Sequence, residues 1–151
     1  MAQTLVQNLL HLIWGTQNQY RFIAPDIKAR LEEYIGGIVR HQDSRPLQIG
    51  AAPNHVHCLI NLSKNYALKK VVEAIKTGSS TWMKQQGPEF RKFYWQRGYA
   101  AFSVSENQKD LVVTYIQNQW EHHRQRTFRE ELMDLLDQQD VRYNEQYLWT
   151  P

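Results

Sequence analysis

Two histidines, His55 and His57, stand one residue apart within the apolar run APNHVHCLI at residues 52–60, and this pair constrains the fold more than any other feature of the chain. The run reads as a buried strand, and side chains on a strand alternate between its two faces. His55 and His57 therefore share one face, while Val56 and Cys58 share the other. Two imidazoles on one face of an apolar strand require a partner, and a divalent cation is a common one.

The periodicity of apolar residues predicts the elements around this strand. Helices are indicated where apolar residues recur at intervals of three and four, and strands where the apolar runs are short. We expect strands at residues 3–16, 47–52, 56–62 and 93–104, and helices at 25–41, from residue 68 to near 87, at 106–124 and at 127–139. Ser105 with Gln108, and Thr127 with Glu130, have the spacing of capping boxes at the starts of the last two helices.

The resulting order is strand, helix, strand, strand, helix, strand, followed by appended helices. This is the β-α-β-β-α-β order of the ferredoxin-like α+β fold, in which two helices pack on one face of an antiparallel sheet. The first and third strands are then central, and the face that carries His55 and His57 is expected to be open to solvent or to a substrate. We predict a single domain, 1–151, made of a core (1–104), a helix carrying Tyr115 (105–125) and an acidic C-terminal helix and tail (126–151).

Composition and charge narrow the class of protein. Hydrophobic residues make up 42% of the 151 residues, as in an ordinary globular protein. The single cysteine, Cys58, excludes an internal disulfide and a cysteine-based zinc site, and no targeting or membrane-spanning segment is evident, so a cytoplasmic location is expected. Residues 1–125 hold 15 basic and 9 acidic residues, whereas 126–151 hold 3 and 6. A basic body indicates a polyanionic partner, although solvated helix faces explain the same charge.

The segment LVVTYIQNQWEHH, residues 111–123, carries groups suited to chemistry at a metal. On a helix, Tyr115 and Gln119 lie about 40° apart, with His122 near the same line, while Val113, Ile116 and Trp120 form a separate buried arc. A phenol beside a divalent cation suggests attack on a phosphodiester, because the metal polarises the phosphate and the phenolate is the nucleophile. The alternative is that Tyr115 is a half-buried helix aromatic and Gln119 an ordinary surface residue.

Together, PNHVH, YIQNQWEHH and the closing RTFREELMDLL and VRYNEQYLW resemble the single-tyrosine HUH transposases of small bacterial and archaeal insertion sequences, the IS200-like family. The resemblance extends almost end to end. HLIWGTQNQYR is similar to the family's first strand and turn, KTGSSTWM to a helix segment, and YWQRGYAAFSVS to its fourth strand.

The resemblance implies a site and an activity. His55 and His57 would be the histidines of the HUH motif, Gln119 the third metal ligand, and Tyr115 the nucleophile that becomes joined to a 5′ phosphate. It also implies Mg²⁺ or Mn²⁺ as cofactor, single-stranded DNA with hairpins as substrate, and a homodimer whose tyrosine helix can complete the partner's site. Asn54 departs from the family, since an Asp is frequent there and would orient the imidazole of His55 more strongly.

DNA contacts are expected from basic and hydroxyl side chains of the central region: Lys69, Lys70, Lys76, Ser79, Ser80, Arg91, Lys92 and Arg97. Interleaved aromatic residues offer stacking surfaces for unpaired bases, although core packing is the expected role of Trp95 and Tyr99. His11 and His41 are assigned to structure. His122 and His123 are also assigned to structure, with a place near the site as the alternative.

Two alternatives to a mobile-element transposase stay open. One is a domesticated relative that processes chromosomal repeat hairpins. The other is a nucleic-acid-binding ferredoxin-like module without catalysis, whose histidines are structural.

Overall fold

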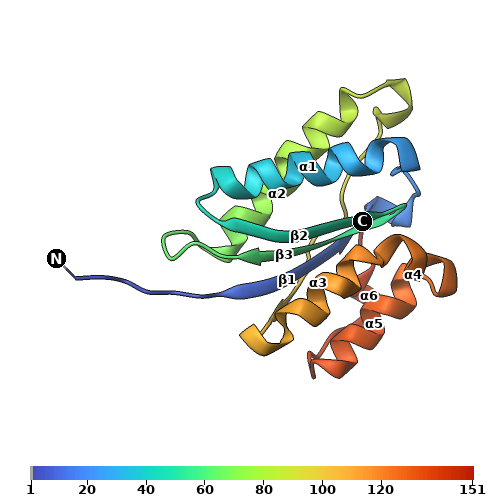
Figure 1. Ribbon diagram of the computed structural model, residues 1–151. Helices are drawn as coiled ribbons and strands as arrows, with labels where there is room; N and C mark the ends of the chain where they lie inside the picture. Colours follow the sequence, from blue (N-terminus) through green and yellow to red (C-terminus); the bar gives the residue numbers. More distant parts are fainter. Residues whose placement is uncertain (1) are drawn as a thin grey trace.

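The computed structural model describes residues 2–151, with the side chains of residues 122–124 excepted, and forms a four-stranded antiparallel sheet with helices on both faces (Figure 1). The strands are β1 (Leu9–Gly15), β2 (Arg45–Ala52), β3 (His55–Asn61) and β4 (Ala100–Ser103). The α-helices are α1 (Pro25–His41), α2 (Leu68–Lys84), α3 (Lys109–Gln117), α4 (Gln119–Gln125), α5 (Phe128–Gln138) and α6 (Glu145–Leu148). Three 3-10 turns are η1 (Gln17–Gln19), η2 (Pro88–Phe90) and η3 (Glu106–Gln108).

The sheet order is β2-β3-β1-β4, with every neighbouring pair antiparallel. This confirms the expected ferredoxin-like α+β fold and places β1 and β3 at the centre. His57 on β3 pairs with Ile13 on β1 on one side and with Gly50 on β2 on the other. The histidine strand is thus held on both sides, which fixes the direction of its side chains.

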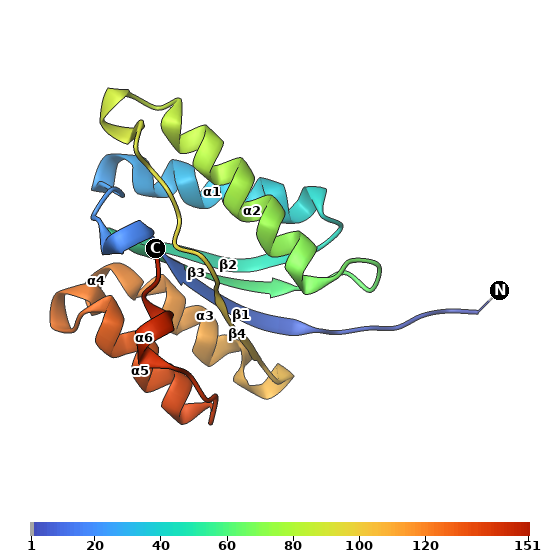
Figure 2. The same cartoon turned by 180° about the vertical axis from the view of Figure 1, so that it is seen from behind.

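Helices α1 and α2 cover one face of the sheet and bury the apolar core (Figures 1 and 2). Pro25 starts α1, where its missing N–H costs no hydrogen bond and its φ suits a helix. The apolar residues of α1 and α2 recur every three or four positions and meet the face of β3 opposite the histidines, so that Val56, Cys58 and Ile60 are fully buried. The predicted bounds of this first helix are confirmed.

Helices α3, α4 and α5 cover the opposite face, which carries His55 and His57 (Figure 1). The expectation that this face would be open is wrong, because His55 is 1% exposed and His57 0% exposed. The C-terminal helices close it through a second apolar cluster, in which Phe128, Leu132 and Leu136 of α5 pack on Ile13 and Phe102. Removal of this apolar surface from water favours the closed arrangement.

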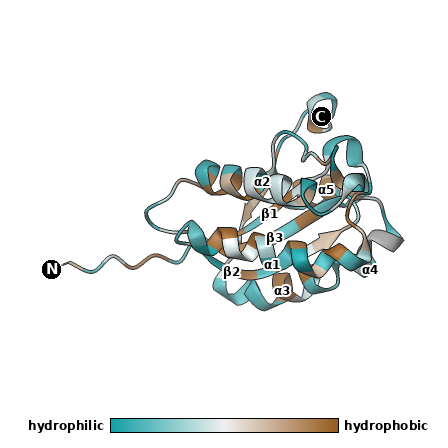
Figure 3. Cartoon of the chain, turned by 90° about the horizontal axis from the view of Figure 1, so that it is seen from above, coloured by the Kyte–Doolittle hydropathy of each residue, from teal (hydrophilic) through white to brown (hydrophobic). Residues whose placement is uncertain are grey.

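Other expected elements differ from the structure at their ends or in the middle. β1 begins only at Leu9, whose partner Asn61 ends β3, and residues 2–8 extend beyond the sheet as a tail (Figure 3). The fourth strand is limited to Ala100–Ser103, because residues 93–99 cross to the sheet as an irregular segment with one bridge from Trp95 to Thr16.

The helix expected at residues 106–124 divides at Asn118, whose φ of −92° and ψ of 11° end α3 before α4 begins. Ser105 makes no capping hydrogen bond, whereas Thr127 and Glu130 form the complete capping box predicted at the start of α5. Among the helices of the described residues, none combines the length and the apolar character that a membrane span requires.

Candidate metal and nucleophile site

Strand β3 presents His55 and His57 toward the C-terminal helices, and a neighbour holds each ring by its Nδ1 atom. His55 Nδ1 lies 2.8 Å from Asn54 Oδ1, and His57 Nδ1 lies 2.8 Å from His11 Nε2. These contacts leave both Nε2 atoms directed to one point above the strand. The contact with Asn54 is the one expected of the residue that precedes the histidine pair, and the structural role assigned to His11 is support of His57.

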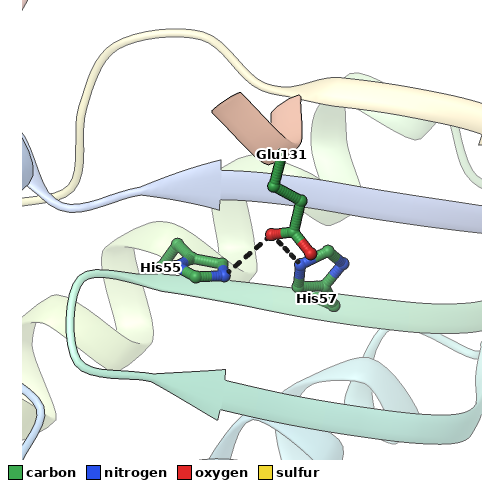
Figure 4. A group of neighbouring side chains, drawn as sticks. All are labelled: His55, His57 and Glu131. Carbon is green, nitrogen blue, oxygen red and sulfur yellow. Dashed lines mark hydrogen bonds and ion pairs between the residues drawn. The ribbon is translucent and has the colours of Figure 1, made fainter. Parts of the chain in front are cut away.

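Glu131 of α5 reaches down between the two imidazoles (Figure 4). Its Oε1 atom lies 3.2 Å from His55 Nε2 and 3.2 Å from His57 Nε2. Gln119, the first residue of α4, lies against the same carboxylate. Its Nε2 atom is 3.0 Å from both oxygens of Glu131 and 2.7 Å from His55 Nε2. One buried carboxylate therefore joins β3, α4 and α5.

Tyr115 of α3 completes the group, because its hydroxyl donates a hydrogen bond to Glu131 Oε2. Arg126 Nη2 donates to Tyr115 Oη at 3.3 Å, and Arg126 Nη1 donates to Asp134 Oδ2 at 2.6 Å. The ring of Tyr115 meets that of His57 edge-on at 5.7 Å between centroids. The four side chains singled out in the sequence, His55, His57, Tyr115 and Gln119, thus converge within one chain.

Burial and charge together set the ionisation of these groups. Burial of Glu131 opposes its ionisation, but the hydrogen bonds from His55 and His57 outweigh burial and hold the pKa of the carboxyl well below its usual range. Burial, with the charge of His57 second, lowers the pKa of His11 to about 3, so His11 is neutral at pH 7. Burial, followed by the charge of Glu131, raises the pKa of the Tyr115 phenol. The phenol is therefore protonated in this arrangement.

The donor set fits a divalent cation. One ligand atom each from His55, His57 and Glu131 lie within 4.8 Å of one another. Gln119 Oε1 is buried and has no hydrogen-bond partner among the described residues. A half-turn of the amide exchanges its oxygen and nitrogen with little change in shape. It would direct Oε1 at His55 Nε2 and Glu131, an arrangement of acceptors that a cation stabilises. Two imidazoles, a carboxylate and an amide oxygen are ligands that Mn²⁺ and Zn²⁺ accept.

Two glycines allow the C-terminal helices to approach the sheet. A Cβ atom on Gly50 of β2 would lie 2.6 Å from the carbonyl oxygen of Ile116, and one on Gly15 of β1 would lie 2.6 Å from the ring of Phe128. Real Cβ atoms do not come so close to other atoms. The absence of a side chain at these positions therefore lets α3 carry Tyr115, and α5 carry Glu131, down to the histidines.

Glu131 is the residue of this candidate site that the sequence analysis did not identify. The signal was present in the helix pattern, since Glu131 stands among Phe128, Leu132 and Leu136 on the buried face of α5. An acidic residue at such a position needs a partner in the fold. The pattern does not say which strand or helix supplies that partner.

The residues expected to contact DNA divide into exposed and buried groups. Exposed side chains are those of Lys69, Lys70, Arg91, Lys92 and Arg97. Ser79 is fully buried, and its hydroxyl donates a hydrogen bond to Ile75 O and accepts one from Trp95 Nε1. The predicted contact between this hydroxyl and DNA is therefore wrong for this conformation.

Lys76 and Ser80 are engaged within the fold. Lys76 Nζ donates to the carbonyl oxygens of Gln96 and Gly98, and Ser80 Oγ receives a hydrogen bond from Lys84 at 2.7 Å. The core role expected of Trp95 is confirmed, since it is buried, whereas Tyr99 is 40% exposed and the core role expected of it is wrong. The side chains of His122 and His123 lie outside the described residues.

Comparison with known proteins identifies relatives over most of the chain. Residues 4–119 match the family model described as "Transposase IS200 like". The ISDra2 transposase TnpA of Deinococcus radiodurans is 24% identical over 114 residues, which are 72% of this chain and 81% of that protein.

Two solved structures share the fold. One, described as a transposase of Deinococcus radiodurans R1, has a TM-score of 0.61 and 21% identity over 80% of this chain and 97% of that one. The other is the structure of a REP-associated tyrosine transposase bound to a REP hairpin, with a TM-score of 0.57 and 12% identity over 79% of this chain and 70% of that one. The family match ends at residue 119, so Glu131 lies in a C-terminal segment beyond it.

Proposed function

Because the chain belongs to the IS200-like transposase family, we propose that it cleaves and rejoins single-stranded DNA at hairpin-marked element ends through a 5′-phosphotyrosine intermediate. One observation carries the proposal. The phenol of Tyr115 and the Nε2 atoms of His55 and His57 meet the same buried carboxylate, that of Glu131. An ordinary helix aromatic would have no reason to lie in such a polar group.

In the proposed cleavage step, Tyr115 Oη attacks the scissile phosphorus. A bond forms between Oη and phosphorus as the phenol proton leaves through Glu131 Oε2 to solvent. The bond from phosphorus to the 3′ oxygen breaks, and that oxygen takes up a proton from solvent to leave as a free 3′ hydroxyl. Glu131 Oε2 already accepts a hydrogen bond from the phenol, and Arg126 supplies a cation beside Oη as its charge develops. Rejoining is the reverse attack by a 3′ hydroxyl, which restores the phenol, and no ATP is needed because the phosphotyrosine conserves the energy of the cleaved bond.

We assign the metal to His55 Nε2, His57 Nε2, Gln119 Oε1 and a Glu131 oxygen, with Mg²⁺ or Mn²⁺ as the cation. When bound, the cation supplies polarisation of the phosphate and charge neutralisation on its non-bridging oxygens. The chain's own contribution is to orient the ligands. Asn54 holds the ring of His55, and neutral His11 holds that of His57, as outer partners of metal-bound histidines commonly do.

The expected homodimer could complete its sites either within one chain or between two chains. Tyr115 contacts Glu131 of its own chain. This contact supports a site assembled in cis, whether or not two chains associate. Mixing His57→Ala with Tyr115→Phe tests this, because each variant supplies what the other lacks only when sites form in trans. We expect the mixture to stay inactive, and restored cleavage would refute assembly in cis.

The test of the function is covalent capture of labelled DNA. A single-stranded hairpin oligonucleotide taken from DNA that flanks the gene is incubated with the protein and Mn²⁺, and the product is resolved under denaturing conditions. We expect a protein–DNA adduct that Tyr115→Phe abolishes while hairpin binding persists. Tyr34→Phe, on the far face of the fold, is the matched control and should still form the adduct. An adduct that persists in Tyr115→Phe would remove Tyr115 from its role.

A second candidate function is processing of chromosomal repeat hairpins by a domesticated relative. The likeness in fold to the REP-associated tyrosine transposase bound to a REP hairpin favours it. The flanking DNA separates the two, because only a mobile element carries matching hairpin ends on both sides of the gene. A non-catalytic binding module is the third candidate, and failure of adduct formation together with retained hairpin binding would favour it.

A further inference from the structure

A cavity of about 300 Å³ lies between the edge strand β4 and the C-terminal helices. Ile13, Ala100 and Phe102 of the sheet contribute to its wall, together with Leu132 and Leu136 of α5. Figure 2 shows β4 beside α5 and α6 on this side of the molecule. The segment that follows residue 119 thus builds half of the cavity, and this half lies outside the family match.

The cavity adjoins the metal and nucleophile site. His57, Ile13 and Ala100 are paired across three neighbouring strands, and Leu132 directly follows Glu131 on α5. Neighbouring strands are about 4.8 Å apart, so the row from His57 to Ala100 spans about 10 Å. At a rise of about 3.4 Å for each stacked nucleotide, the cavity lies within about three nucleotides of a phosphate held at the site.

Aromatic rings and unpaired cations surround the mouth of the cavity. Tyr99, Tyr143 and Tyr147 line it, and Tyr99 and Tyr147 are 40% and 68% exposed. Arg97 and Arg142 also line it, both are exposed, and neither guanidinium has a hydrogen bond or ion pair with the described part of the chain. Lys76 Nζ lies 6.0 Å from the centre of the Tyr99 ring, and the Tyr147 ring is the more exposed of the two. An apolar hollow with exposed rings at its mouth suits a flat heterocycle, and the unpaired cations of Arg97 and Arg142 suit the phosphates attached to it.

We propose that this cavity, here named the C-terminal base pocket, binds one unpaired base of the single-stranded DNA close to the scissile phosphate. The proposal rests on the transposase function proposed above and adds to it a contact made by the segment beyond residue 119. Tyr147 and Tyr99 stack on the base, while Arg97 and Arg142 hold the flanking phosphates. A purely apolar ligand would leave both guanidinium groups without a function. A base in a duplex cannot enter the pocket unless it first leaves its pairing partner and its stack.

Photocrosslinking tests where the base lies without any need for cleavage. The probe is a twelve-nucleotide oligothymidylate with a single 5-iododeoxyuridine, bound to the full chain in a chelator and irradiated, with crosslinked peptides identified by mass spectrometry. We expect the crosslinks to fall on peptides that contain Tyr99 or Tyr147. Crosslinks confined to the α1 and α2 face, or crosslinks absent despite saturated binding, would overturn the pocket.

Affinity measurements with matched variants test the stacking. Loss of one stacking ring weakens binding by about 5- to 100-fold. We therefore expect such a loss for Tyr147→Ala in fluorescence anisotropy with the same oligothymidylate, whereas Tyr147→Phe keeps the ring and should bind normally. Tyr34→Ala, an exposed tyrosine on the far face, should also bind normally. Equal affinity for Tyr147→Ala and the wild type would refute the proposal, as would an equal loss for Tyr147→Phe.

A scan with abasic positions separates this proposal from the proposed function. In the hairpin substrate of the adduct assay, one base at a time is removed within three nucleotides of the cleaved bond. At one position, removal should reduce the rate of adduct formation in the wild type but not further in Tyr147→Ala. Adduct formation without any such position would overturn the pocket and leave the transposase function standing. Crosslinking at the pocket without any adduct would overturn the proposed transposase function and leave the base pocket standing.

Discussion

The two faces of β3 are equally buried but differ in what fills them. On one face, Val56, Cys58 and Ile60 lie in an apolar core beneath α1 and α2. On the other face, His55 and His57 are just as inaccessible but meet Glu131, Gln119 and Tyr115 beneath α3, α4 and α5. The two faces belong to one strand, and their side chains alternate along it.

This difference shows that burial alone does not separate a core from a site. The side chains of the apolar face are stabilised by packing, and exposing any of them to water would cost free energy. The histidine face gathers hydrogen-bond donors around a single carboxylate and keeps Gln119 Oε1 without a partner among the described residues. Two imidazoles and a carboxylate gathered in this way could hold a cation, whereas a hydrocarbon core could not.

The largest expected effect comes from placing a charge on the apolar face. Val56→Asp puts an unpaired carboxylate in the core, and we expect the free energy of unfolding to fall by about 4 kcal/mol or more in urea denaturation. Asn61→Asp adds the same charge at the partly exposed end of the same strand, and should change stability by less than about 1 kcal/mol. Equal losses for the two variants would mean that the faces do not differ as described.

A smaller effect is expected from disturbing the approach of α3 to the histidine face. Gly50→Ala places a Cβ atom 2.6 Å from the carbonyl oxygen of Ile116. Because backbone has to move, we expect a loss of about 3 kcal/mol in thermal or urea unfolding, together with slower adduct formation by Tyr115. Gly37→Ala on α1 meets nothing within 4 Å and should stabilise the protein by about 0.5–1 kcal/mol. Similar outcomes for the two glycines would contradict the close approach.

Removal of the carboxylate charge tests the histidine face as a metal site. Glu131→Gln keeps the size of the side chain, and we expect at least a tenfold weaker affinity for Mn²⁺ in titration calorimetry, or about 1.4 kcal/mol. Glu130→Gln is the control, because Glu130 caps the start of α5 and faces away from the histidines. Unchanged Mn²⁺ affinity in Glu131→Gln would exclude Glu131 as a ligand.

The smallest expected effect is a pH dependence of stability in the metal-free protein. His57, Tyr115 and Glu131 face His11, whose pKa is lowered to about 3, so the unfolded chain binds a proton below about pH 6.5 that the folded chain does not. Stability is therefore present above pH 6.5 and is lost as the pH falls toward 3. We expect a loss of about 1 kcal/mol between pH 7 and 5.5 by urea denaturation.

Matched variants identify the group responsible for that loss. His11→Gln should remove the pH dependence, whereas His41→Gln, at an exposed position on α1, should retain it. A dependence that persists unchanged in His11→Gln would assign the titration to another group.

Much of the fold was predictable because its signals are local. The helix over residues 25–41 follows from the spacing of its apolar residues, and the central position of the histidine strand follows from the order of the elements. The division of the long helix at Asn118 and the shortness of β4 were not predictable, because each depends on what packs against the segment. Likewise, Tyr115 and Gln119 were recognisable as candidates, but their distance from β3 was not.

The sequence by itself determined which groups are available, since alternation on a strand puts His55 and His57 on one face, and helical spacing puts Glu131 among apolar neighbours. Only the tertiary structure decided that these groups meet, that the histidine face is closed, and that Glu131 is the residue joining them. The physical reason is that the spacing of residues fixes the direction of their side chains only within a single helix or strand. The meeting of β3 with α3, α4 and α5 instead depends on apolar packing between Ile13, Phe102 and Phe128 and on the clearance left by Gly15 and Gly50, which are contacts between distant parts of the chain.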